Sequence, residues 1–180
     1  PIPPNTNTWT VNLYDLNTKS TGYLETMQSY DTNGGLLDVK IFPEYYSDPG
    51  QIDIHNLCWI ARNIYEAVIT TDPSAVFIWP GPNTIFAASD TVLFQALMLN
   101  FTAQAHYVGS CGMGNDSEIH CVDKNFLLRG TKNVRVCDAS AMPLEKDCHG
   151  NVYPVQNDGN TTRGVNVLSV VCANKLLNKL

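Results

Sequence analysis

Alternating apolar and polar residues characterise the first part of the chain. A period of two predicts a strand over residues 8–16, where the apolar positions are Trp9, Val11 and Leu13. Residues 23–28 and 36–42 also have the character of strands. The segment between them, Asp-Thr-Asn-Gly-Gly at residues 31–35, is typical of a hairpin turn because Asn and Gly accept positive φ. Three strands joined by turns predict an antiparallel sheet.

Helical spacing takes over after this predicted sheet. Apolar residues recur at positions 54, 57, 60, 64 and 68 and predict a helix of about five turns that ends near Asp72-Pro73. Ser89 is placed as the N-cap of a second helix. Residues 165–180 form an apolar stretch that predicts a final helix. We therefore expect an α+β chain.

The region before the final helix is less regular. Residues 134–136 predict a short buried strand that leads into a turn at Asp138. Residues 144–159 are rich in Pro, Gly, Asn and Asp and are expected to be irregular.

Composition narrows the function classes. The chain has 180 residues, 44% hydrophobic residues and a net charge of -6, which is enough for a real core and disfavours nucleic acid or an anionic membrane surface as partner. We find no run of the roughly 18 apolar residues that a membrane span needs. The sequence starts at Pro1 without a Met, so we expect it to be a piece of something larger.

The six cysteines, at positions 58, 111, 121, 137, 148 and 172, include no C-x-x-C pair and no matched histidines, so we expect no metal site. Their even number allows disulfides, and buried free thiols are an equal alternative. Three N-x-[ST] sequons, at Asn100, Asn115 and Asn160, favour a secreted protein or one of the secretory pathway.

The most informative stretch runs from His106 to Pro143. It contains His-Tyr-Val-Gly-Ser-Cys-Gly-Met-Gly at residues 106–114, Val-Asp at 122–123, and a predicted strand that ends in Asp-Ala-Ser-Ala-Met-Pro at 138–143. This order resembles the C-terminal signature of the glucose–methanol–choline (GMC) family of FAD-dependent oxidoreductases. The resemblance covers nearly the whole chain, and its strong part is residues 106–143.

The resemblance implies a chemistry and an architecture. It implies that the chain is the C-terminal part of an alcohol or sugar oxidoreductase that transfers hydride from a CH–OH group to FAD. Residues 1–105 would belong to a substrate-binding domain with an antiparallel sheet and flanking helices. Residues 106–180 would carry the catalytic segment and complete the α/β FAD-binding domain.

The resemblance also implies site residues. His106 would be the catalytic base, and imidazole suits this step because its pKa of about 6.5 lies near working pH. Asp138 and Ala139 would contact the ribityl and phosphate part of FAD, and Gly109 would lie beside the flavin. The other histidines, His55, His120 and His149, are expected to be structural or on the surface.

A second polar residue is expected to face the base across the substrate carbon. Asn160, in Gly159-Asn160, fits when the position is counted back from the final helix, and it would serve both substrate and cofactor. Asn151 fits when it is counted forward from Pro143, and Asn166 is a third candidate. A neutral Asn can both donate to and accept from the substrate oxygen.

The sequence contains no G-x-G-x-x-G unit of the kind that binds the FAD pyrophosphate. An N-terminal portion of the same protein, or a separate chain, is therefore the expected partner, together with a small alcohol or sugar. The sequence departs from the family at Gly112, where many members carry Arg, at residues 165–167, which lack the common Pro, and in the longer segment 144–159. A non-catalytic protein on this fold, or a lyase of the hydroxynitrile type, remains the alternative.

Overall fold

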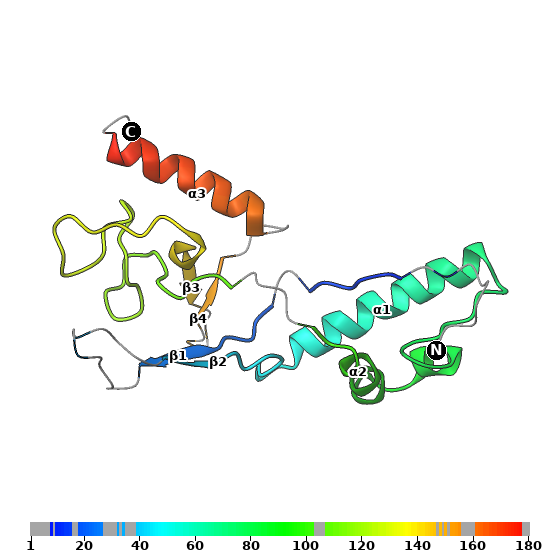
Figure 1. Ribbon diagram of the computed structural model, residues 1–180. Coiled ribbons are helices and arrows are strands. Elements are labelled where there is room, and N and C mark those ends of the chain that lie inside the picture. Colours follow the sequence, from blue (N-terminus) through cyan, green and yellow to red (C-terminus); the bar gives the residue numbers. More distant parts are fainter. Residues whose placement is uncertain are drawn as a thin grey trace. The chain divides into compact units, whose positions relative to one another are not determined.

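The structure is a computed structural model, and Figure 1 shows its helices and strands. It describes residues 8, 10–15, 18–26, 32, 34, 39–102, 107–146, 148, 150, 152–155 and 161–177. The chain forms two compact units. The first comprises Pro1–Thr18 with Asp48–Gln104, and the second comprises Lys19–Ser47 with Ala105–Leu180.

The first unit is helical. The helix α1 spans Ile52–Thr71 and packs against the shorter α2, Asp90–Met98, and the 3₁₀ helix η1, Asn83–Ala87. The apolar spacing predicted the helix α1 correctly. Of the five apolar positions in that pattern Leu57 is buried and the other four are half-buried, while Cys58 and Ala61 are buried beside Leu57. In η1 and α2, which pack against α1, the buried side chains are Phe86, Leu93 and Leu97.

Two polar side chains hold this unit together. The buried carboxylate of Asp48 accepts hydrogen bonds from the backbone N–H of Ile52 at 2.6 Å and of Asp53 at 3.3 Å, so it caps α1. Arg62 donates to the backbone oxygens of Phe86 at 2.9 Å and Ala88 at 2.8 Å. These bonds attach the middle of α1 to the chain that enters α2. Ser89 is the N-cap of α2 as predicted, although its side chain makes no cap hydrogen bond.

The second unit contains two short antiparallel hairpins and a helix. Strand β1, Tyr23–Thr26, pairs with β2, Val39–Phe42, and the rings of Tyr23 and Phe42 stack at 4.7 Å. Strand β3, Leu144–Lys146, pairs with β4, Val152–Pro154, and α3 spans Thr161–Leu176. The β1–β2 hairpin and the final helix were predicted from the sequence.

The core of the second unit lies between an irregular chain segment and α3. Val122, Phe126, Ala141 and Cys172 are all at most 1% exposed. Cys137 and Cys172 form a disulfide, with 5.9 Å between their Cα atoms, which attaches α3 to the segment that precedes Asp138. Cys58 is a buried free thiol. The disulfide and the buried free thiol, the two alternatives that the sequence left open for the cysteines, are therefore both present.

Three sequence-based expectations were wrong. The described residues 8 and 10–15 form no strand, and Val11 is 44% exposed, so the alternating pattern does not correspond to a buried face there. Residues 134–136 form no regular strand, because only Arg135 makes a β-bridge, with Leu127. The segment 144–159 is not irregular throughout, since it contains the β3–β4 hairpin.

The α+β class is confirmed, with three α-helices and two short antiparallel sheets in the described residues. None of the described helices has both the length and the apolar character that crossing a bilayer requires. The division at residue 105 into a substrate domain and an FAD-domain segment is a functional prediction that the structure does not test.

Candidate functional site

The structure brings the two strongest sequence motifs together within the second unit. Gly109 donates its backbone N–H to the oxygen of Ala139 at 3.1 Å, and Cys111 donates to the oxygen of Ser140 at 2.9 Å. Met113 continues the series by donating to Met142 at 3.3 Å. The glycine segment 109–114 therefore lies beside the turn 138–142, although about thirty residues separate them in sequence.

Asp138 is at the start of the 3₁₀ helix η2, Ala139–Ala141, and acts as its N-cap. Its carboxylate accepts a hydrogen bond from the backbone N–H of Ser140 at 2.9 Å and a second, short one from the Ser140 hydroxyl. The residue is exposed. These bonds fix the direction of the carboxylate and leave it accessible to a ligand.

Two glycines of the segment 109–114 are required by close approach. A Cβ at Gly112 would lie 2.2 Å from Cγ of Leu144, and one at Gly114 would lie 2.1 Å from Nε2 of His120. Real Cβ atoms essentially never come so close. The departure from the family at Gly112 thus has a physical reason, because Leu144 occupies the space next to it.

His120 has the structural role expected of it. The residue is 8% exposed, Nδ1 of its ring lies 2.8 Å from the backbone oxygen of Asp116, and Nε2 lies 3.3 Å from that of Leu144. Both ring nitrogens are therefore engaged with the backbone.

His106 lies outside the described residues. Its neighbour Tyr107 is described, and its hydroxyl lies 3.0 Å from that of Tyr45. This hydrogen bond raises the pKa of Tyr45 to about 12. Glu44 and Tyr46, on either side of Tyr45, have positive φ values of 45° and 58°. A sharply bent backbone thus presents Tyr45 to the chain that follows His106.

Of the three asparagine candidates for the second polar residue, the structure describes one. Asn160 and Asn151 both lie outside the described residues, whereas Asn166 lies on α3 with an exposed side chain. The beginning of α3 lies close to the turn 138–142, since a Cβ at Gly164 would lie 2.5 Å from Cε of Met142. The structure therefore brings together Gly109, Asp138 and Ala139, and leaves the places of His106 and Asn160 as predictions.

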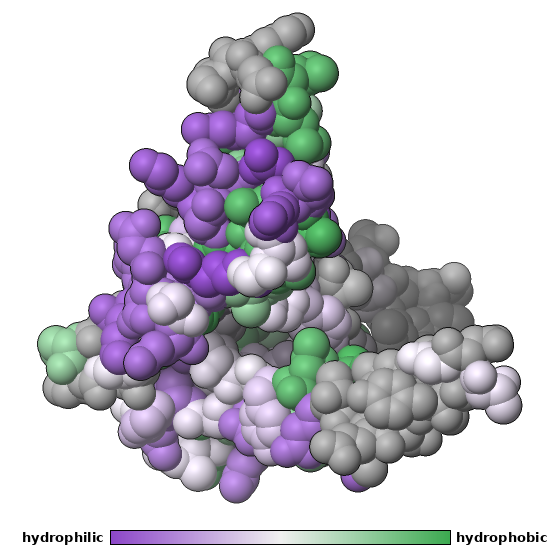
Figure 2. All heavy atoms as spheres, turned by 90° about the vertical axis from the view of Figure 1, so that its left-hand side faces the viewer, coloured by the Kyte–Doolittle hydropathy of each residue, from purple (hydrophilic) through white to green (hydrophobic). Residues whose placement is uncertain are grey.

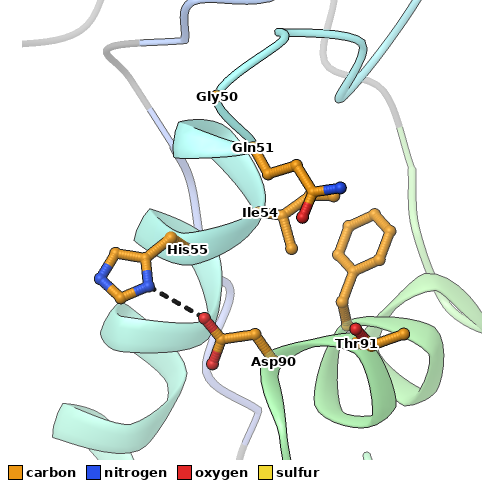
Figure 3. A pocket seen from close by; sticks show the side chains of 7 residues that line it. Gly50, Gln51, Ile54, His55, Asp90 and Thr91 are labelled. Atoms are coloured by element: carbon orange, nitrogen blue, oxygen red, sulfur yellow. Dashed lines mark hydrogen bonds and ion pairs between the residues drawn. The ribbon is translucent and has the colours of Figure 1, made fainter.

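Sequence reasoning missed one polar cluster, in the first unit. Figure 3 shows His55 of α1 and Asp90 of α2 pointing toward one another beside a pocket of about 330 Å³, and their Nδ1 and Oδ2 atoms are 2.9 Å apart. Arg62 contacts the other oxygen of Asp90 at 2.6 Å. The Arg62 guanidinium, and then His55, hold the pKa of Asp90 below its ordinary value. The pairing of Arg62 with an N-terminal Asp of α2 has no signal in the sequence, because 28 residues separate them.

No group of three or more potential metal ligands occurs among the described residues. Among Gly109, Asp138 and Ala139, the carboxylate of Asp138 is a hydrogen-bond acceptor that suits the hydroxyl groups of a ligand.

Comparison with known proteins adds an independent result. The model of the family described as GMC oxidoreductase matches residues 19–155. An alcohol dehydrogenase [acceptor] from Pseudomonas putida is 32% identical over 138 residues, which are 75% of this chain and 23% of that protein. The chain therefore spans about a quarter of the length of the curated relative that it matches.

Proposed function

Because this chain belongs to the GMC oxidoreductase family, we propose that it is the C-terminal part of an FAD-dependent enzyme that oxidises the CH–OH group of an alcohol or sugar. The observation that carries the proposal is the row of backbone hydrogen bonds between the glycine segment 109–114 and the turn 138–142. These are the two motifs on which the family resemblance depends. Their contact supports a shared site.

The residues present suit FAD. The exposed carboxylate of Asp138, oriented by Ser140, can accept hydrogen bonds from ribityl hydroxyls, and the backbone at Ala139 lies beside it. FAD, when bound, would accept the hydride from the substrate carbon. Gly109, whose N–H is bonded to Ala139, would keep the chain that follows His106 next to this position.

In this proposal His106 takes the proton of the substrate hydroxyl. Asn160 orients the same oxygen, because an amide can donate one hydrogen bond and accept another. Tyr107 follows His106 in the sequence, and its hydroxyl contacts that of Tyr45. We therefore propose that these two tyrosines line the approach to the base.

An N-terminal portion is the proposed partner. Two apolar side chains on one side of α3 are about 60% exposed, namely Val167 at 59% and Val170 at 61%, and Leu177, directly after α3, is 62% exposed. Figure 2 shows hydrophobic side chains gathered beside the C-terminal end of the chain, at the top of that view. Exposed apolar surface of this kind is typical of an interface. We propose that the FAD-binding portion covers it.

A secretory location is part of the same proposal. Disulfides persist in oxidising compartments and are rare in the cytosol. The Cys137–Cys172 disulfide and the sequons at Asn100 and Asn115 support this location together.

The experiment uses the full-length protein with bound flavin, mixed without oxygen with a panel of alcohols and sugars while flavin absorbance is followed. His106→Ala should retain the flavin but slow its reduction by about 10²- to 10⁴-fold, which is the usual contribution of a positioned base. His55→Ala is the matched control, because His55 is an exposed histidine of the first unit, and it should leave the rate unchanged.

Slowing by less than about tenfold in His106→Ala would place the base elsewhere. A flavin that no alcohol or sugar reduces would favour the lyase or the non-catalytic alternative. The second polar residue is tested in the same assay. Asn160→Ala should weaken transition-state binding by about 1–3 kcal/mol, whereas Asn151→Ala should have little effect.

A further inference from the structure

Two of the remaining cysteines meet within the candidate site. Cys111 belongs to the glycine segment, and Cys121 lies on the chain that runs beside this segment. The backbone N–H of Cys121 donates to the oxygen of Gly112 at 3.0 Å, and Met113 and Val122 form a parallel β-bridge. The two segments are therefore held in register by the backbone, independently of the cysteine side chains.

The paired segments place the two cysteines next to each other. Gly112, which follows Cys111, accepts hydrogen bonds from the backbone N–H groups of both Cys121 and Val122, at 3.0 and 3.3 Å. Burial, and then the neighbouring thiol of Cys121, raise the pKa of Cys111 to about 11. Cys111 is half-buried and Cys121 is exposed. Paired segments lie about 5 Å apart, which is within the range of about 4.4–6.8 Å between Cα atoms that a disulfide needs.

Three of the other four cysteines do not compete with the pair. Cys137 and Cys172 are already joined to each other, and Cys58 is buried in the first unit. Cys148 is exposed, beyond strand β3. The existing disulfide also indicates that the second unit matures where thiols are oxidised.

We propose that Cys111 and Cys121 form a second disulfide, which fastens the glycine segment 109–114 to the chain at residues 120–122. The oxidant is a small-molecule disulfide such as oxidised glutathione. Cys121 as thiolate attacks one of its sulfurs and releases one molecule of the small thiol, so that a mixed disulfide forms. Cys111 as thiolate then attacks the sulfur of Cys121 and releases the second molecule. Two protein thiols are oxidised, one small disulfide is reduced, and the two protons end on the two small thiols.

The order of these steps follows from exposure and acidity. Cys121 is accessible to a small disulfide, whereas Cys111 is half-buried and its pKa is raised, so little of it is thiolate near neutral pH. Cys121 therefore reacts first, and Cys111 completes the bond.

The test uses full-length protein purified without reductant, with free thiols alkylated before digestion. Trypsin alone keeps both cysteines on one peptide, because no Lys or Arg occurs between Arg62 and Lys124. A second protease that cleaves after Glu118 separates them. The expected result is one cross-linked pair that joins the Cys111 and Cys121 peptides, with their alkylated forms appearing only after reduction.

Variants test the order of reaction. After incubation with oxidised glutathione, Cys111→Ser should gain the mass of one glutathione at Cys121, whereas Cys121→Ser should leave Cys111 unmodified. Cys148→Ser is the matched control and should form the Cys111–Cys121 bond as before. Both cysteines recovered in the alkylated form, from protein in which Cys137 and Cys172 are joined, would overturn the proposal. So would a cross-link of Cys121 to Cys148.

Discussion

Replacing Gly112 by Ala tests the packing of the glycine segment directly. The added Cβ would lie 2.2 Å from Cγ, 2.3 Å from Cδ1 and 3.0 Å from Cδ2 of Leu144. Carbon atoms in favourable contact are about 3.5–4.0 Å apart, so Leu144 must retreat by more than about 1 Å. Its retreat is restricted, because its backbone N–H is bonded to Met113 and its side chain also lies close to Gly109.

Overpacking of this kind usually destabilises a protein by about 1–3 kcal/mol, and we expect the middle of this range, about 2 kcal/mol. The readout is hydrogen exchange at the backbone amides of Cys121 and Val122, because both donate to the oxygen of Gly112, at 3.0 and 3.3 Å. Since every 1.4 kcal/mol is a factor of ten, their exchange should be about 30-fold faster in Gly112→Ala.

The double variant Gly112→Ala/Leu144→Ala separates this clash from other effects. Shortening Leu144 removes all three atoms that the new methyl group would meet. The two substitutions should therefore be non-additive, with the double variant more stable than the sum of the two single effects predicts. Unchanged exchange in Gly112→Ala, or additive effects in the double variant, would refute the packing argument.

Three further results are expected. Gly22→Ala should destabilise the β1–β2 hairpin more than Thr21→Ala does, measured by hydrogen exchange, because its Cβ would lie 2.2 Å from a backbone oxygen, that of Phe42, which cannot rotate away. Phe126→Ala should lower the free energy of unfolding of the second unit by about 3–5 kcal/mol, measured with urea, because Phe126 is 1% exposed in the core. The ion pairs of Asp90 should make the stability of the first unit depend on pH. Because the pKa of Asp90 is lowered on folding, their stabilisation is present above its unfolded pKa of about 3.9 and is lost as pH falls through the lower folded value. An acid titration of unfolding should show this loss in the natural protein and less of it in Asp90→Asn.

The helices were predictable because their signals are local. In α1 the apolar positions 54, 57, 60, 64 and 68 recur at helical spacing, and all five are buried or half-buried in the structure. The β1–β2 hairpin was predictable for a similar reason, since its turn residues and the character of its strands lie within twenty residues. Residues 8–16 show how this reasoning fails. Their apolar residues recur with the period of a strand. A strand also needs a second strand to pair with, and the described residues of this segment pair with none.

The contacts of the candidate site depend on long-range pairing. The sequence places Gly109 and Asp138 in one site only through the resemblance to a family, and the bond from Gly109 to Ala139 joins residues thirty positions apart. The hairpin β3–β4 was missed because its polar, Gly- and Pro-containing sequence is typical of loops. It is held by its surroundings, where Leu144 donates to Met113 and Val155 donates to Pro143.

The disulfide between Cys137 and Cys172 makes part of the chain into a covalent ring. The ring begins just before Asp138, includes the β3–β4 hairpin and Asn160, and closes near the end of α3, with a sequence separation of 35 residues. A protease that cuts the backbone once inside the ring releases no fragment, because the two pieces stay joined through sulfur. On a denaturing gel the cut protein would migrate as one species until a reductant is added. The part of the chain that carries both the Asp138 turn and the candidate asparagines can therefore be nicked without being lost.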